Sequence, residues 1–443
     1  MINKLYSLTL LFILMLTSGS IFAQQVNVSA EIRPRYEFRH GYKTLFPDDV
    51  KAANFISQRT RLNGFFSNQT FKAYVSLQDV RVWGDVNQLN TSDVNGFSVH
   101  EAWGQVRFCD VFSLKVGRQE IAYDDQRMFG SVGWAQQARS HDAAILKFTF
   151  NPNNKLDVGL ALNAMKETLY EVKYTNKNYK ALQYVWYHGN FGKHGLSVLF
   201  LNNGIAYDGN ESDSIYDEKV SYSQTLGARY TLKTDKIGFD AAAYSQMGKN
   251  AKHNDLSAFY FSANINFQAT KAFNIGLGGE YLSGTSTKNQ GLESEKDKSF
   301  TPFYGTNHKF NGWMDYFYVG NYIGKNGLID IYLPLKIKVQ KVTFALIPHY
   351  FLAAATVSAY DESIQGFKDY SNGLGTEIDF SVTYALSKSV IIAGGYSQMF
   401  GTETMQAVNY PENPSGEFHK NTNNWAWIML TFKPTFFSKD GSQ

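Results

Sequence analysis

The sequence predicts an all-β fold, a transmembrane antiparallel β-barrel of about 18 strands. Three observations support this prediction. Apolar and polar residues alternate with period two along many short segments. The connections between these segments alternate between short and long. Beyond the N-terminal region, no apolar run reaches the roughly 18 residues that a membrane-spanning helix needs.

The N-terminal segment has the features of a signal peptide. Lys4 supplies a positive charge, residues 8–16 form an apolar run, and small residues lead up to Ala23. The run is too short to cross a bilayer as a helix, which disfavours an N-terminal membrane anchor. We therefore predict that residues 1–23 are a signal peptide. Residues 24–443 are then a single outer-membrane β-barrel domain, located in the cell outer membrane of a Gram-negative type of bacterium.

The first predicted strand alternates without a break from Val26 to Arg39. Its even-numbered positions are apolar, such as Ile32, and its odd-numbered positions are polar or charged, such as Arg33. Successive side chains of a strand point to opposite faces of the sheet. This strand therefore has one face suited to lipid and one face suited to a polar lumen.

Similar alternation recurs along the chain and marks the other strands. The 18 predicted strands lie at about 26–39, 54–66, 70–81, 99–108, 112–120, 138–150, 155–164, 181–188, 195–202, 224–232, 237–246, 257–267, 273–283, 328–338, 342–351, 375–384, 390–400 and 424–432. Eight connections between them are short and nine are long, and each short one falls between two long ones. Short periplasmic turns and long extracellular loops alternate in this way in outer-membrane barrels, with an even strand number and both termini in the periplasm.

Soluble all-β architectures fit the sequence less well. A β-sandwich of this length would consist of several domains with linkers, and none is visible. A propeller would show repeats of about 40 residues, which are also absent from the sequence. A barrel with this number of strands encloses an aqueous lumen instead of a packed core.

Composition supports a barrel and limits the partners. Aromatic residues make up 16 % of the chain, with 36 glycines and only 9 prolines, which suits many strands, tight turns and aromatic girdles. A net charge of +3 gives no reason to expect a nucleic-acid partner. The single cysteine, Cys109, excludes an intramolecular disulfide. No metal site and no cofactor are expected, and the surrounding partners are outer-membrane lipid and lipopolysaccharide.

Arginine is concentrated in the first third of the chain. Ten of the 11 arginines fall at or before position 139, and Arg229 alone follows. Charged side chains on the lipid face near the bilayer midplane cost about 2–4 kcal/mol, so we expect the arginines to face the lumen. They would form one basic sector of the pore wall, comprising Arg33, Arg35, Arg39, Arg59, Arg61, Arg81, Arg107, Arg118, Arg127 and Arg139.

This sector allows several functional hypotheses. Arginine keeps its charge and binds carboxylates through a two-pronged fork, so the sector suits a porin-like channel for anionic or polar solutes such as sugar acids or anionic polysaccharide. Alternatively, the arginines pair with acidic residues on the same faces and only brace the wall, as in a general nutrient porin. The long loops leave a third hypothesis, a closed barrel with a structural or adhesive role.

An enzyme is not predicted. The sequence contains neither a GxSxG elbow nor an HExxH motif. His141 and Asp142 are adjacent and would point to opposite faces of one strand. No set of residues therefore converges as a catalytic site would require.

Two loop segments carry a resemblance to a known family. They are "VGRQEIAYDDQRMFGSVGWAQQARSHDA" at 116–143 and "TPFYGTNHKFNGWMDYF" at 301–317. Both resemble signature stretches of the alginate-export family of outer-membrane β-barrel channels. "SQRTRLNGFF" at 57–66 and "LQDVRVWGD" at 77–85 are also similar to that family.

The resemblance implies an 18-stranded barrel with an arginine-rich conduit for an anionic polysaccharide. By matching positions, it assigns Arg118, Gln119, Asp125, Arg127 and Arg139 to the first loop and its flanking strands, and Asn307, His308, Lys309 and Asp315 to the second. These residues either hold an ordered loop in the barrel mouth or contact the solute directly. A periplasmic partner is usual for export channels, and nothing in the sequence identifies one.

Overall fold

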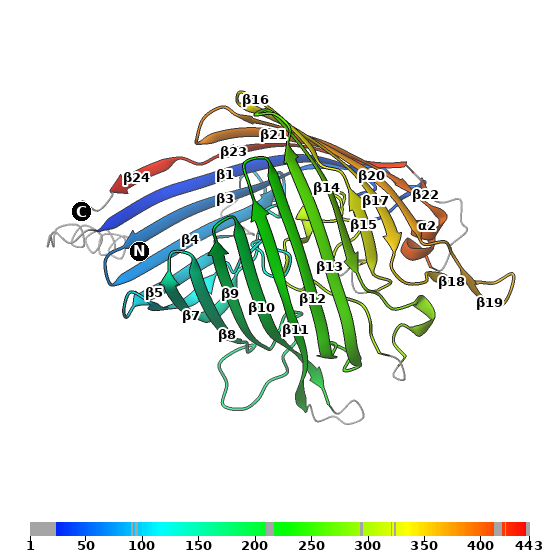
Figure 1. The fold of residues 1–443 in the computed structure, drawn as a ribbon, viewed down its shortest axis with the longest axis horizontal. Helices are drawn as coiled ribbons and strands as arrows, with labels where there is room; N and C mark the ends of the chain where they lie inside the picture. The colour runs from blue at the N-terminus through cyan, green and yellow to red at the C-terminus, as the bar shows by residue number, and fades with distance from the viewer. Residues whose placement is uncertain are drawn as a thin grey trace.

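The barrel wall is one antiparallel sheet that closes on itself (Figure 1). The computed structural model describes residues 24–89, 92–93, 96–209, 217–292, 296–319, 321–322, 325–411, 419–420 and 422–439. Closure occurs at β1 (Gln25–His40), which pairs with β3 (Ala53–Ser67) on one side and with β23 (Thr422–Phe432) and β24 (Thr435–Lys439) on the other. The predicted signal peptide, residues 1–23, lies outside the described residues.

The remaining wall strands follow one another in chain order. They are β4 (Phe71–Val82), β5 (Ser98–Arg107), β6 (Phe112–Gln119), β7 (His141–Asn151), β8 (Asn154–Leu162), β9 (Ala181–Phe191), β10 (His194–Asp208), β11 (Glu218–Lys233), β12 (Ile237–Lys249), β13 (Asp255–Gln268), β14 (Phe273–Leu282), β15 (Leu328–Tyr332), β16 (Leu335–Val339), β17 (Val342–Ala353), β20 (Gly373–Ala385) and β21 (Val390–Gly401).

The 20 strands of this sheet make 18 crossings of the wall within the described residues. β15 and β16 together pair with β14 and β17, so they are one crossing, and β23 and β24 together pair with β1. Each interruption contains a proline, Pro334 or Pro434. Proline has no N–H to donate to the ladder, so a strand breaks there.

The structure confirms every predicted strand and changes several boundaries. β10 extends to Asp208 and β11 begins at Glu218, so the loop predicted at 202–223 is shorter than expected. The connection between β12 and β13, predicted as long, comprises residues 250–254. Both changes add strand at the end of the barrel opposite the chain termini, where polar residues such as Asn202 and Gln224 still pair across the ladder.

Exposure follows the predicted alternation of faces. In β1, Ile32 is 40 % exposed and Tyr36 is 39 % exposed, whereas Arg33 is 7 % exposed and Glu37 is fully buried. The outer face of the barrel exposes apolar side chains, as a lipid-facing surface does, and the charged side chains point into the barrel interior. No helix among the described residues is long and apolar enough to span a membrane.

Small elements decorate the long loops at the end of the barrel away from the termini (Figure 1). They are β2 (Phe46–Pro47), which pairs with β22 (His419–Lys420), the hairpin of β18 (Ser358–Asp361) and β19 (Gly366–Asp369), the helix α2 (Glu403–Asn409), and the 3-10 turn η1 (Thr287–Asn289). A second 3-10 turn, η2 (Asn307–Lys309), belongs to a loop inside the barrel.

Two loops contribute buried residues instead of extending outward. Inner loop one is residues 120–140, between β6 and β7, and inner loop two is residues 301–319, between β14 and β15. Phe129 of the first and Met314 of the second are at most 1 % exposed. Both loops contact charged side chains on the inner faces of wall strands, so they lie across the lumen.

Candidate functional site

The two inner loops bind each other through their backbones. The N–H of Gly130 donates to the carbonyl of Tyr304 at 2.8 Å, and the N–H of Thr306 donates to the carbonyl of Gln126 at 2.9 Å. Trp134 stacks on His308 with ring centroids 4.5 Å apart. Together the loops form a partition inside the barrel, and we refer to them jointly by that name.

Inner loop one is held by arginines of the wall, which we call the basic wall. Arg33 Nη1 donates to the carbonyl of Gly133 at 2.7 Å, and Arg35 Nη1 donates to the carbonyl of Trp134 at 2.7 Å. Arg33 also reaches the side chain of Gln136 at 2.9 Å. A guanidinium has five N–H donors and no acceptor, so it suits a loop that presents carbonyl oxygens.

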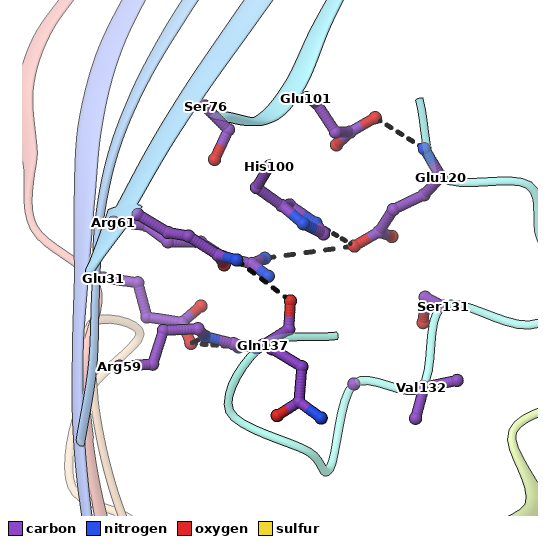
Figure 2. Close-up of polar contacts among 12 residues, drawn as sticks. Glu31, Arg59, Arg61, Ser76, His100, Glu101, Glu120, Ser131, Val132 and Gln137 are labelled. Atoms are coloured by element: carbon purple, nitrogen blue, oxygen red, sulfur yellow. Dashed lines mark hydrogen bonds and ion pairs between the residues drawn. The ribbon is translucent and has the colours of Figure 1, made fainter. Parts of the chain in front are cut away.

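A second set of contacts fixes both ends of inner loop one (Figure 2). At its start, Glu120 is bonded by His100 Nε2 at 2.8 Å and lies 3.9 Å from a guanidinium nitrogen of Arg61. The Glu120 N–H donates to Glu101 at 3.0 Å. Near its end, the carbonyl of Gln137 accepts from Gln78 at 3.1 Å. The loop therefore leaves the wall and returns to it at fixed points.

Arg59 completes the basic wall. It forms an ion pair with Glu31 of the neighbouring strand and donates to the carbonyl of Gln136 at 3.4 Å. Arg35 similarly pairs with Glu37 at 2.9 Å. These arginines are 4–7 % exposed, so most of their donors serve the wall and the loop.

Inner loop two is held by carboxylates of β14, β15 and β20, which we call the acidic wall. It comprises four side chains that are at most 5 % exposed, Glu280, Asp330, Glu377 and Asp379. The N–H of Trp313 donates to Asp379 at 3.1 Å, and the N–H of Met314 donates to Glu377 at 2.8 Å. Carboxylates accept and do not donate, so this wall suits a loop that presents backbone N–H groups.

One arginine links inner loop one to the acidic wall. Arg127 is 1 % exposed, and its Nη2 donates to Glu280 at 2.7 Å and to the amide oxygen of Asn311 at 3.0 Å. The amide nitrogen of Asn311 donates in turn to Glu280 at 3.1 Å and to Asp330 at 3.2 Å. Its guanidinium also lies 4.5 Å from the ring centroid of Phe310. Arg127 thus joins both inner loops to one buried ionic cluster.

A latch ties inner loop two to the loop after β1. Asp315 accepts from the hydroxyl of Tyr42 and pairs with His308 Nδ1 at 2.9 Å. Burial alone would raise the pKa of Asp315, but His308, Tyr42 and Lys43 together hold that pKa below its ordinary value. Asp315 is therefore charged in the assembled latch.

Between the basic wall and the partition lies a cavity of about 460 Å³, which we call the basic cavity. Arg39 and Lys43 line it together with Tyr42, Trp134 and Tyr318. The Arg39 side chain is 33 % exposed, and its guanidinium lies 4.2 Å from the ring centroid of Tyr42. Of the arginines that line this space, Arg39 is the most exposed, Arg81 follows at 29 %, and Arg35 is buried.

Two predicted arginines differ in their relation to this site. The register pairs Arg81 with Gln58, on the strand face opposite to that of Arg59 and Arg61, yet Arg81 lines the basic cavity at the end of β4. Arg81 binds Asp79 at 2.6 Å. Arg107 is 52 % exposed and pairs with Asp110 in a short turn.

Two further arginines lie near the ends of inner loop one. Arg118 pairs with Asp142 at 2.8 Å, and the two side chains are 42 % and 62 % exposed. Arg139 donates to the carbonyl of Gly305 in inner loop two at 3.2 Å. Burial lowers the pKa of Arg139 from its ordinary value. Arg139 therefore contacts the partition, whereas Arg118 lies outside it.

The remaining loop-motif residues are part of the partition or its attachment. Gln119 is buried and donates to the carbonyl of Ala143 at 2.9 Å. Asp125 accepts from the N–H of Arg127 at 3.0 Å, and Lys309 donates to the carbonyl of Asp125 at 2.8 Å. Asn307 is 3 % exposed, and its amide has no hydrogen-bond partner among the described residues.

Sequence reasoning missed the acidic wall as a site. Glu377 and Asp379 alternate with Ile378 and Phe380, so the pattern places them on the lumen face. Arginine drew attention because it is concentrated in one part of the chain, whereas acidic residues are spread along it. The available signal was that each carboxylate occupies a lumen-facing position in its strand. The sequence did not indicate that carboxylates from distant strands would lie together.

One group of residues has the composition of a metal site. Ligand atoms of His100, Glu101 and Glu120 all lie within 4.8 Å of one another. The Arg61 guanidinium lies 3.9 Å from Glu120, and a fixed positive charge at that distance disfavours a cation there. The group is better suited to anchoring the start of inner loop one.

Comparison with known proteins gives a family and a fold. The family model described as "Alginate export" matches residues 24–410. No curated protein matches the chain. Among solved structures, OccAB1 of Acinetobacter baumannii has a TM-score of 0.60 at 11 % identity, with 93 % of this chain and 97 % of that chain covered. OccAB4 of the same organism gives 0.59 at 11 % identity, covering 94 % and 100 %. OccK11 (OpdR) of Pseudomonas aeruginosa gives 0.56 at 10 % identity, covering 93 % and 96 %.

Proposed function

The chain belongs to the alginate-export family and is an outer-membrane channel, and from this premise we propose that it passes anionic solutes along the basic wall. The solute class is that of sugar acids or an anionic polysaccharide. The single observation that carries the proposal is the basic cavity, where Arg39 and Lys43 face a space of about 460 Å³ between wall and partition. Guanidinium and ammonium groups at a constriction favour anions.

The arginines divide into two roles under this proposal. Arg33, Arg35 and Arg59 direct their donors to loop carbonyls and to Glu31 or Glu37, so they brace the partition. Arg39 keeps an exposed guanidinium edge, and Lys43 is exposed beside it. Selection among solutes would therefore depend on Arg39 and Lys43, whose cationic groups are accessible, and not on every arginine of the sector.

Aromatic side chains complete the basic cavity. Tyr42, Trp134 and Tyr318 provide apolar faces beside the two cations. A sugar acid presents both an apolar ring face and a carboxylate, so it matches this lining better than a small inorganic anion does.

The test is ion selectivity in planar bilayers. We expect the wild-type reversal potential to show anion preference, and Arg39→Glu with Lys43→Glu to abolish or reverse it. Lys166→Glu is the matched control, because Lys166 is an exposed lysine that does not line the basic cavity. Equal selectivity of the wild type and the double variant would contradict the proposal.

One observation favours a second candidate, a general porin with little selectivity. Glu37 binds both Arg35 at 2.9 Å and Arg39 at 2.8 Å, which reduces the net positive charge at the basic cavity. Liposome swelling distinguishes the two functions. A general porin admits solutes in order of size alone, whereas the proposed channel admits galacturonate faster than the neutral sugar galactose.

A further inference from the structure

A second cavity lies in the sector formed by β10 to β13, away from the basic wall. Its volume is about 610 Å³, within the range that holds small ligands. Three of the strand residues lining it, Asn203, Ser223 and Gln246, are at most 4 % exposed and belong to the halves of β10, β11 and β12 remote from the short turns. We call this space the outer cavity, because its lining lies at the strand ends and loops remote from the short turns.

Inner loop two forms one side of the outer cavity. Gln246 holds this loop twice, since its amide nitrogen donates to the carbonyl of Thr301 at 2.7 Å and its amide oxygen accepts from the N–H of Thr301 at 3.0 Å. The hydroxyl of Tyr304 donates to Asn203. The position of this side relative to the wall is therefore fixed.

Two aromatic rings of that loop face the cavity. The rings of Phe303 and Tyr304 stack with centroids 5.9 Å apart, and both residues line the space. Phe303 has φ of +29°, a conformation that a bulky residue adopts only when the surroundings impose it. The fold thus holds a flat apolar surface against the cavity at a cost in backbone strain.

The charged residues around the outer cavity are unequal in sign. Four lysines line it, Lys177, Lys249, Lys252 and Lys325, against one described carboxylate, Asp297. The carboxylate of Asp297 accepts hydrogen bonds from two neutral side chains, Asn250 at 2.9 Å and Thr285 at 3.0 Å. Lys249 pairs with Asp255 at 2.7 Å.

The side chains of the other three lysines are exposed. No described carboxylate lies within ion-pair distance of Lys177, Lys252 or Lys325. Side-chain amides such as Asn254 and Gln290 lie between them and supply both donors and acceptors. Cations, amides and a flat apolar surface together match a ligand that has carboxylates, hydroxyl groups and apolar ring faces.

We propose that the outer cavity binds an oligosaccharide bearing carboxylates, with its ring faces on Phe303 and Tyr304 and its carboxylates on the lysines. The acidic character of the ligand rests on the proposed function, whereas the cavity and its lining do not. The cavity would then be a second binding site, distinct from the basic cavity, since no residue lines both spaces. A solute would contact both places on its way through the barrel.

The experiment is equilibrium binding to the intact protein in detergent, measured by calorimetry. The probes are trigalacturonate and the neutral trisaccharide maltotriose, each at low and high salt. We expect the wild type to bind trigalacturonate more tightly than maltotriose, with the difference reduced by salt. We expect Lys252→Ala with Lys325→Ala to weaken trigalacturonate binding about tenfold and to leave maltotriose unchanged.

Controls separate this site from the basic cavity. Lys166→Ala should bind like the wild type, and the loss caused by Lys252→Ala with Lys325→Ala should persist when Arg39→Glu and Lys43→Glu are also present. Equal affinity for both trisaccharides, or an unaltered affinity in the Lys252 and Lys325 variant, would overturn the inference. If trisaccharide binding follows the prediction but the bilayer recordings show no anion preference, only the proposed function is wrong. If the recordings show anion preference but trigalacturonate does not bind preferentially, only the inference about the outer cavity is wrong.

Discussion

The basic wall and the acidic wall hold the same partition in opposite ways. Arg33 and Arg35 bind inner loop one through carbonyl oxygens, whereas Glu377 and Asp379 bind inner loop two through backbone N–H groups. A peptide unit offers one donor and one acceptor, so the charge of a wall decides which side of the loop backbone faces it. The difference teaches that buried charges of either sign can fix a loop, provided that the loop turns the matching peptide group toward them.

The comparison also changes the meaning of the arginine sector. Arg35 and Arg59 are paired with Glu37 and Glu31, which offset their charge, and burial keeps a passing solute away from them. The cations with access to the basic cavity, Arg39, Lys43 and Arg81, are a different set. Selectivity and rigidity are therefore carried by different members of one cluster.

The largest expected effect comes from breaking the connection between the two walls. Arg127→Met leaves Glu280 buried without its cation, which should cost about 3–5 kcal/mol of unfolding free energy. The measurement is chemical unfolding of the barrel in detergent, followed by intrinsic fluorescence. Arg127→Met with Glu280→Gln should recover most of the loss, and the exposed Arg107→Met should show none. Wild-type stability in the single variant would show that the ionic connection contributes little.

The next prediction tests whether each wall holds only its own loop. Arg33→Met removes donors to inner loop one, and Asn311→Gly removes the amide that bonds Glu280 and Asp330 while keeping the positive φ of +60° accessible. Each should cost about 1.5–3 kcal/mol, as hydrogen bonds to charged groups do. Limited proteolysis mapped by mass spectrometry should show new cleavage in 133–137 for the first variant and in 309–315 for the second. Cleavage of both loops in both variants would mean that the partition opens as one unit.

A smaller effect is expected from crowding the acidic wall. Gly312 has φ of +81°, and an added Cβ would lie 2.6 Å from an oxygen of Glu377. Gly312→Ala should cost about 1–2 kcal/mol from the left-handed backbone, with a further cost from the contact. Gly84→Ala is the control, because Gly84 has φ of +92° and nothing within 4 Å of the added Cβ. Equal unfolding free energies for the two variants would remove the steric part of the argument.

The smallest effect concerns the latch at Asp315. His308, Tyr42 and Lys43 hold the pKa of Asp315 below its ordinary value despite burial. The latch is therefore fully formed above the unfolded pKa of about 3.9 and weakens as pH falls through the lower folded pKa. Single-channel current noise should rise only in strongly acidic solution for the wild type. Asp315→Asn should be noisier at neutral pH and nearly independent of pH; the same acid response in both would assign it to another group.

The sequence predicted the barrel well because strand alternation is a local property. Each of the 18 predicted strands is present, since a lipid-facing row and a polar row can be read from a few consecutive residues such as Ile32 and Arg33. The two inner loops were also marked by their motifs. The role of their residues was left open between holding a loop and contacting a solute. In the structure Gln119 bonds the neighbouring wall strand, Asp125 bonds within inner loop one, and Arg127 joins that loop to Glu280 of the wall.

The sequence by itself determined the number of strands, the faces of each strand and the concentration of arginine in the first third of the chain. Only the tertiary structure decided which arginines are occupied and which remain accessible. Arg33 meets Gly133 across 100 residues, and Arg127 meets Glu280 across 153. Closing the barrel brings such residues together, and the hydrogen-bonding needs of the enclosed loops then select their partners. Local patterning carries no information about those long-range matches, because the same alternation fits any loop that enters the lumen.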